Sequence, residues 1–177
     1  MLSTSIKPTA LCGPASKSWG KMNHRIIIAE SRDQFRSAQT IVAAYAEYLG
    51  IDLSFQNFAG EMAKFSDMYG LPSGSMIMLE VDGSVVGAVG LRRFSEGVAE
   101  MKRMFILPQY QGNGFGNSLI RSFIERAREL NYKSIKLDTI PRLDKAFSLY
   151  RKFGFQIVEP YRFNPDPETL YMELVLS

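Results

Sequence analysis

The chain has 177 residues, of which 46% are hydrophobic and 22% are charged, and this length suffices for one domain with its own core. No apolar stretch approaches the roughly 18 residues that a membrane-spanning helix needs. One cysteine, Cys12, and one histidine, His24, leave little material for disulfides, zinc sites or histidine-dependent triads. We therefore predict a cytoplasmic protein with no membrane partner and no bound metal.

The formal net charge of +3 is concentrated in residues 1–22, which contain Lys7, Lys17 and Lys21 and no acidic residue. The charges of the remainder balance, so we predict no nucleic-acid partner. We divide the chain into an N-terminal extension, residues 1–22, and one domain, residues 23–177. The extension lacks the arginines typical of a transit peptide. Two other interpretations are a non-catalytic arm and a true start at Met22.

The first elements in chain order are a strand and a helix. "HRIIIAE" (24–30) is rich in β-branched residues and predicts a buried strand. Ser31 suits the N-cap of a helix that runs to Leu49, and Gly50 ends it. Aromatic and apolar residues then recur every three or four positions between 55 and 65, which predicts a second helix with a core-facing stripe.

A hairpin and a βαβ unit follow. Two apolar runs within residues 75–94 flank Asp82-Gly83, a pair that favours a type I′ turn. The run 98–107 extends the meander, an amphipathic helix covers 114–130, and "SIKLDTI" (134–140) is a strand. Because a helix connects the strands 98–107 and 134–140, these two strands should be parallel, and the sheet should be mixed.

The C-terminal part completes the order β-α-α-β-β-β-α-β-α-β-β. "LDKAFSLYRKFGF" predicts a helix ending at Gly154, a suitable C′ residue. "FQIVE" and "YMELVL" predict two further strands. The loop between them contains three prolines and should lie at the surface.

The segment "QYQGNGFGNSLI" (109–120) places three glycines directly before a helix. Backbone N–H groups at such a helix start can converge on a phosphate. The P-loop would need Lys-Ser or Lys-Thr after the last glycine, whereas Asn117-Ser118 stands there, and the dinucleotide fingerprint would need G-x-G-x-x-G. A glycine loop that binds no ligand, or a phosphate-binding regulatory domain, are the alternatives on this segment.

Residues 24–177 resemble the GNAT superfamily of N-acetyltransferases. Gln111 to Gly116 fit its Q/R-x-x-G-x-G/A motif, and "LYRKFGF" lies some 40 residues later, as in a bacterial branch of the family. The resemblance implies an α/β (mixed α+β) fold: a central mixed sheet of six to seven strands flanked by about four helices. It also implies acetyl-CoA as co-substrate.

The resemblance implies where acetyl-CoA binds. The glycine loop would hold the pyrophosphate, and the strand before it would part from its parallel neighbour at a bulge and pair with the pantetheine arm. The implied binding residues are Met104, Phe105, Ile106, Gln111, Gly112, Asn113, Gly114, Phe115, Gly116 and Asn117.

Two catalytic residues are carried over from the family. Glu100, 11 residues before Gln111, would act as general base through water; the alternative is a carboxylate paired in solvent with Lys102 or Arg92. Tyr150 would protonate the departing thiolate, since a phenol of pKa about 10 can donate to a thiolate of pKa about 8.5. The alternative for Tyr150 is a packing role on an amphipathic helix.

One departure from the family pattern concerns Leu143, which stands where many relatives have an asparagine that contacts the cofactor. Asp144 is a candidate replacement. In the family the acceptor groove would be formed by residues 50–57, Asp138-Thr139 and the segment 161–164.

The predicted function is therefore transfer of an acetyl group from acetyl-CoA to a primary amine, by direct attack in a ternary complex. The acceptor would be a small molecule or a peptide, and a homodimer is one form that the assembly can take. The alternative function is a non-catalytic acyl-CoA-binding module that docks a partner.

Overall fold

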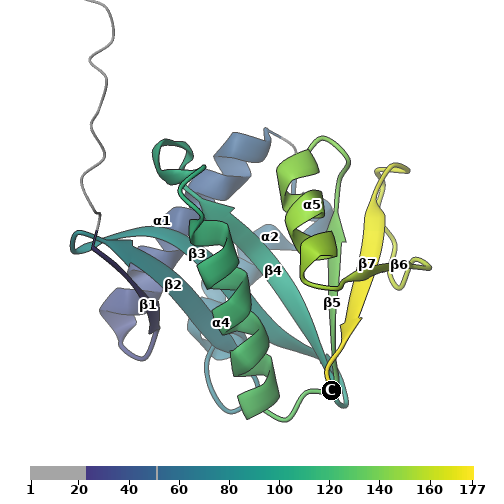
Figure 1. The fold of residues 1–177 in the computed structure, drawn as a ribbon, viewed down its shortest axis with the longest axis horizontal. Coiled ribbons are helices and arrows are strands. Elements are labelled where there is room, and N and C mark those ends of the chain that lie inside the picture. The colour runs from purple at the N-terminus through teal and green to yellow at the C-terminus, as the bar shows by residue number, and fades with distance from the viewer. Residues whose placement is uncertain (1–22, 51) are drawn as a thin grey trace, which may run out of the picture.

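The computed structural model describes residues 23–50 and 52–177, so the expectations for residues 1–22 lie outside its range. One seven-stranded sheet runs through the molecule in the order β1-β2-β3-β4-β5-β7-β6, and only β4 and β5 pair in parallel (Figure 1). In chain order the elements are β1 (His24–Ile28), α1 (Arg32–Leu49), the 3-10 turn η1 (Ser54–Gln56), α2 (Phe58–Ala63), α3 (Phe65–Met68), β2 (Ser75–Val81), β3 (Ser84–Ser95), β4 (Val98–Ile106), the 3-10 turn η2 (Pro108–Tyr110), α4 (Phe115–Glu129), β5 (Ser134–Thr139), α5 (Asp144–Lys152), β6 (Gln156–Val158) and β7 (Leu170–Val175).

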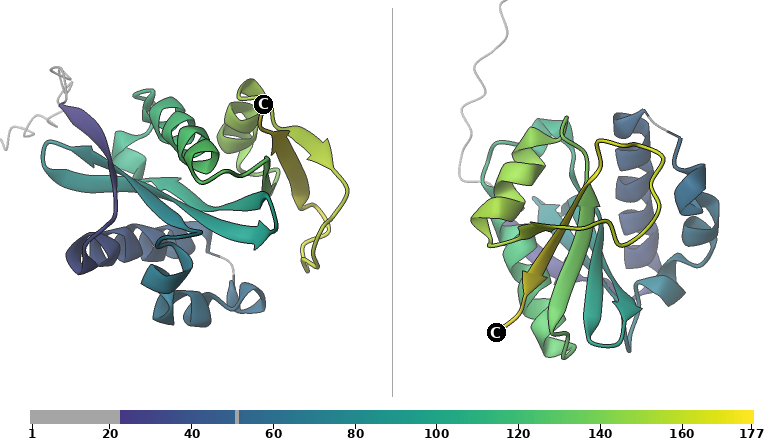
Figure 2. Two further views of the ribbon diagram at one scale, coloured as in Figure 1. Left: turned by 90° about the horizontal axis from the view of Figure 1, so that it is seen from below. Right: turned by 90° about the vertical axis from the view of Figure 1, so that its right-hand side faces the viewer.

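Helices cover both faces of the sheet, as Figure 2 shows: α4 and α5 lie on one face, and α1 to α3 lie on the other. Each face has its own hydrophobic core. Leu119, Ile120 and Phe123 of α4 are fully buried against the first face, and Ala38 and Val42 of α1 against the second. None of the helices in the described ranges is long and apolar enough to cross a membrane.

The residues that the sequence predicted to begin and end α1, and to form the turn between β2 and β3, do so in the structure. Ser31 and Gln34 form a capping box at the start of α1, and Gly50 ends that helix in the left-handed region. Asp82 and Gly83 both have positive φ, as a type I′ turn requires, and Val81 pairs with Ser84 across it. The predicted hairpin and the parallel pair are therefore confirmed.

The segment 54–68 differs from the single second helix that its apolar spacing predicted. The structure divides it into η1, α2 and α3, because Asn57 has φ 54 and Lys64 has φ −113, both outside the helical range. Glu61 is directed inward and is bonded to Arg103 and Tyr69. The spacing of apolar residues gives no sign that a polar residue such as Glu61 is also buried, and this explains why the sequence predicted one continuous helix.

A bulge in β4 opens the sheet. Phe105 pairs with Ala88 but Lys102 pairs with Gly90, so β4 has one residue more than β3 in this interval, and Arg103 has φ 57. The parallel pairing of β4 with β5 covers only residues 98–100, and Figure 1 shows the two strands diverging beyond it. The predicted bulge and separation of these strands are both present.

Gly90→Ala is expected to destabilise the fold by about 1–3 kcal/mol, because a Cβ at this position would lie 2.4 Å from the buried ring of Tyr69. The matched control is Gly60→Ala, where the Cβ would meet only the movable side chain of Asn57 and alanine favours the helix. Thermal unfolding should show a fall of several degrees for Gly90→Ala alone. Equal melting temperatures for the two variants would contradict this account.

Candidate active site

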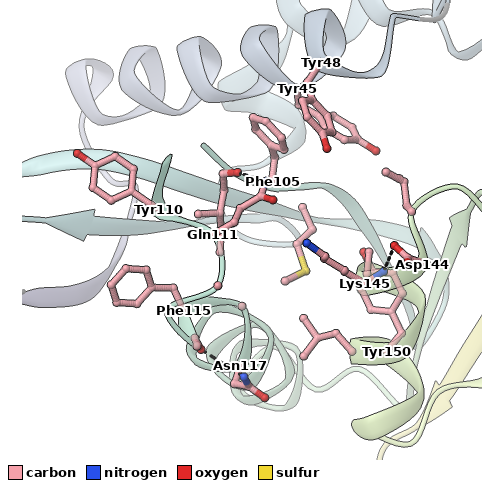
Figure 3. A pocket seen from close by; sticks show the side chains of 18 of the residues that line it. Tyr45, Tyr48, Phe105, Tyr110, Gln111, Phe115, Asn117, Asp144, Lys145 and Tyr150 are labelled. Carbon is pink, nitrogen blue, oxygen red and sulfur yellow. Dashed lines mark hydrogen bonds between the residues drawn. The ribbon is translucent and has the colours of Figure 1, made fainter. Parts of the chain in front are cut away.

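A cavity of about 460 Å³ lies where β4 and β5 diverge, between the start of α4 and the start of α5 (Figure 3). Nine of the ten residues that the sequence assigned to the cofactor line it; Asn113 is the exception, because its side-chain amide donates to the backbone oxygens of Tyr110 and Gln111 within the loop. Seven further lining residues were not predicted from the sequence: Tyr45 and Tyr48 of α1, Tyr110 of η2, Arg142 of the loop after β5, and Lys145, Ala146 and Leu149 of α5.

The glycine loop places the N-terminus of α4 at this cavity. Gly112 has φ 81 and Gly114 has φ 79, and a Cβ at either position would meet no other atom within 4 Å. No side chain caps α4 at Gly114, so N–H groups in the first turn of this 15-residue helix are available to a ligand, except that of Asn117, which donates to the Gly114 carbonyl at 3.0 Å. Backbone donors and the positive end of the helix dipole suit an anion such as a phosphate.

The second half of β4 presents an unpaired edge to the same cavity. Phe105 and Ile106 pair with β3 on one side, while the pairing with β5 has stopped at Glu100. The backbone groups on the β5 side of this segment can therefore accept an extended ligand as an additional strand. Gln111 stabilises the turn that follows by donating to the Ile106 carbonyl at 2.7 Å.

Tyr150 points into the cavity from α5, as Figure 3 shows, and its side chain is 7% exposed. Burial, with smaller effects of Tyr45 and Asp138, raises the pKa of this phenol above its usual value, so it stays protonated at neutral pH. Leu143 and Asp144 also line the cavity, and Asp144 accepts a hydrogen bond from the Lys145 backbone. Lys145 adds a cation there that sequence reasoning missed.

A second cavity of about 410 Å³ adjoins the first, since Tyr45 and Leu143 line both. It brings together parts of the three segments that the resemblance had assigned to the acceptor: Asp52, Leu53, Ser54 and Gln56, the pair Asp138-Thr139, and Asn164. The lining that was not assigned includes Pro165, Asp166 and Thr169 of the following loop and the apolar residues Leu49 and Ile140. We call it the acceptor cavity. Tyr161, also assigned to the acceptor, packs instead against Phe94 and Tyr171.

Glu100 is fully buried and lines neither of these cavities. It lines a third one of about 390 Å³, together with Arg92, Asp67 and Met68. Its carboxylate accepts a hydrogen bond from Arg92 Nε at 2.7 Å and is paired with Arg162. The contact with Arg92 was foreseen, but in solvent rather than in the interior.

A buried polar cluster anchors α2 to the β4 bulge. Arg103 donates to Glu61 Oε2 at 2.8 Å, and Tyr69 Oη donates to Glu61 Oε1 at 2.7 Å. Burial opposes ionisation of Glu61, but the hydrogen bonds and charge of Arg103 outweigh it and lower the pKa of the carboxyl. This cluster keeps the bulge, and with it the free edge of β4, in place.

The described residues form no group of three or more His, Cys, Asp or Glu side chains that could hold a metal ion. The two adjoining cavities offer backbone donors and a buried phenol, and the ionic groups of β4 and β5 lie next to them. The split sheet and its two cavities offer space for two ligands side by side.

Comparison with known proteins identifies the family to which this chain belongs. Residues 40–155 match the model of the Acetyltransferase (GNAT) family. The chain is 37% identical to an uncharacterised N-acetyltransferase of Schizosaccharomyces pombe over 139 residues, 77% of this chain and 85% of that protein. It is 25% identical to another from Dictyostelium discoideum, over 85% of this chain and 98% of the other. A GNAT acetyltransferase structure from Staphylococcus aureus shares the fold with a TM-score of 0.71 at 20% identity, covering 86% of this chain and 100% of the other.

The chain belongs to the GNAT family of acetyltransferases, and the protein is an N-acetyltransferase. The general reaction of this family is acetyl-CoA-dependent transfer of an acetyl group to an amine. The fold predicted from the resemblance, a mixed sheet of six to seven strands flanked by about four helices, is confirmed, with seven strands and five α-helices in the described residues.

Proposed function

We propose that this protein transfers the acetyl group of acetyl-CoA directly to a primary amine while both substrates are bound. The observation that carries the proposal is the adjoining pair of cavities, which meet at Tyr45 and Leu143 beside the gap between β4 and β5. A donor in the first cavity and an amine in the acceptor cavity would meet at this gap without a covalent enzyme intermediate.

The first cavity suits acetyl-CoA in three respects. The free amides at the start of α4 fit the pyrophosphate, and the unpaired edge of β4 at Met104 to Ile106 fits the amide-bearing pantetheine arm. Arg142 and Lys145 add positive charge to the lining. A structural neighbour from Elizabethkingia anophelis, similar with a TM-score of 0.52 at 21% identity, is described with acetyl-CoA bound.

The chain's own groups can handle the two protons of the reaction. An alkylammonium of pKa about 10 must lose a proton before it can attack. We propose that Glu100, whose carboxylate lies between Arg92 and Arg162, assists this loss through water. Tyr150, held protonated by burial, would donate to the departing thiolate in the first cavity.

The alternative of a binding module without catalysis is weaker on this structure. Such a module needs the first cavity, but it needs neither a second cavity adjoining it nor the buried phenol of Tyr150 in the lining. The proposal includes a small molecule or a peptide as the source of the amine. It also includes a homodimer as one form of the assembly.

The test is a thermal-shift titration of the full chain with acetyl-CoA, with ATP and NAD as controls. At about 100 times its dissociation constant a ligand adds roughly 2.7 kcal/mol of stability, which corresponds to several degrees in this size range. We expect acetyl-CoA to stabilise the protein and the other nucleotides to do so much less. Thiol release with a panel of primary amines then tests turnover. No stabilisation by acetyl-CoA would overturn the proposal.

A further inference from the structure

Lys102 is a buried lysine to which the reaction described so far gives no role. Its side chain is 5% exposed, although lysine is among the residues most rarely buried without a partner. It lies on β4 directly before the bulge residue Arg103. Ala99 and Met101 of the same strand pack into the core under α4, so alternation directs Glu100 and Lys102 to the opposite face.

The ammonium of Lys102 lies directly behind the wall of the acceptor cavity. Nζ donates to Gln56 Oε1 at 3.1 Å and lies 3.5 Å from Asp138 Oδ1, and both of these partners line that cavity. The register that pairs Glu100 with Lys136 would, if continued, place Lys102 opposite Asp138. The ion pair therefore bridges β4 and β5 where their backbone pairing has ended and the cofactor cavity opens.

The surroundings of Lys102 favour its neutral form. Burial, the largest effect, lowers its pKa to about 8; Arg103 of β4 and Arg92 of β3 act in the same direction, whereas Asp138 of β5 and Glu61 of α2 oppose it. Near pH 8 a large fraction of Lys102 therefore carries a free lone pair. This is the range in which a general base works best at physiological pH.

The contacts of Lys102 and Glu100 favour Lys102 as the first proton acceptor. Transfer from an alkylammonium of pKa about 10 to a lysine of pKa about 8 is unfavourable by only roughly a hundredfold. Neither side chain lines the acceptor cavity itself, but Lys102 is bonded to two of the lining residues, Gln56 and Asp138. The carboxylate of Glu100 is instead occupied by Arg92 and Arg162.

We propose that Lys102 receives the proton of the acceptor ammonium, which docks on Asp138. This inference rests on the proposed function. One proton passes from the ammonium nitrogen to Nζ, directly or through one water, and then to solvent. The freed amine forms the new C–N bond while the C–S bond of the thioester breaks. Tyr150 gives its phenol proton to the departing thiolate. The nitrogen, once bonded to the acetyl carbon, loses a second proton, and this proton restores the phenol of Tyr150.

The first experiment follows the side-chain 13Cε signals of lysine in the full chain from pH 6 to 10.5, with Lys102→Arg identifying the signal. Lys102 should titrate near pH 8, about two units below the ordinary value of 10.4. Titration of Lys102 at 10 or above would overturn the proposal, whether or not turnover has been found. The control Lys64→Gln removes an exposed lysine and should leave the signal near 8 unchanged.

The second experiment measures kcat/KM against pH for an alkylamine that turns over. The parent profile should rise with pH and level off near 8, where Lys102 becomes neutral. Lys102→Arg and Lys102→Gln should lose about 10²–10³-fold at pH 7.5 and should lose the levelling near 8, with unchanged KM for acetyl-CoA. Glu100→Gln should be slower but should keep the levelling. A profile in Lys102→Gln parallel to that of the parent would overturn the proposal.

Two acceptor amines that differ in the acidity of their ammonium form show whether Lys102 acts as a base or only supports the structure. A trifluorinated analogue of the alkylamine has a far more acidic ammonium and arrives neutral at pH 7.5, so it needs no base. The loss in Lys102→Gln should nearly disappear with this acceptor; an equal loss with both acceptors would mean that Lys102 only supports the wall of the cavity. Absence of acetyl-CoA binding in the parent protein would refute the proposed function, and it is recognised separately by the thermal-shift titration.

Discussion

Gly114→Arg is expected to abolish the binding of acetyl-CoA while the protein remains folded. Gly114 precedes α4 with φ 79 and lines the first cavity, and no atom lies within 4 Å of a Cβ built there. The new side chain would therefore extend into the space assigned to the pyrophosphate rather than into the core. The left-handed backbone adds a cost of about 1–2 kcal/mol, which a domain of this size tolerates.

Two controls isolate the effect of bulk at the cradle. Gly83→Arg places arginine at another positive φ, 83, in the exposed turn between β2 and β3, which lines none of the described cavities. Gly114→Ala imposes the same backbone conformation as Gly114→Arg without a long side chain. Calorimetric titration with acetyl-CoA should show binding in Gly83→Arg, weaker or unchanged binding in Gly114→Ala, and none in Gly114→Arg. Parent affinity in Gly114→Arg would refute the cradle assignment.

Tyr150→Phe is expected to lower kcat by about 10²-fold or more, the usual contribution of a positioned proton donor. The change removes one oxygen from a side chain that is 7% exposed and lines the first cavity, so packing and acetyl-CoA affinity should change little. Because burial raises the pKa of this phenol, the parent should show no loss of activity from its ionisation below pH 10.

Tyr132→Phe is the matched control for this change. It removes the hydrogen bond from Tyr132 Oη to the Ser73 carbonyl, which is 2.6 Å long and joins two residues that line neither the first cavity nor the acceptor cavity. This change should cost about 1 kcal/mol of stability without lowering kcat. Steady-state kinetics with saturating acetyl-CoA would distinguish the two variants. A Tyr150→Phe enzyme with the kcat of the parent would leave Tyr150 as a packing residue.

The sequence determined most of the elements because their signals are local. The amphipathic period of α4, the Asp82-Gly83 turn and the Ser31 cap act through residues a few positions apart, so they can be recognised without the fold. The glycines before α4 belong to the same class, since positive φ and a bare helix start are backbone properties. The fold and nine lining residues of the first cavity followed from these signals and from the family resemblance.

Only the tertiary structure decided how the charged residues are used. Glu61, Lys102 and Arg103 look like surface residues in the sequence, yet all three are buried, because the β4 bulge turns two consecutive side chains to one face, where α2 and β5 provide their partners. Burial in turn sets the pKa of Lys102, since desolvation depends on every element packed around it. Periodicity and motifs describe a residue's neighbours along the chain, whereas the acidity of these groups depends on neighbours that the fold brings from 36 to 46 residues away.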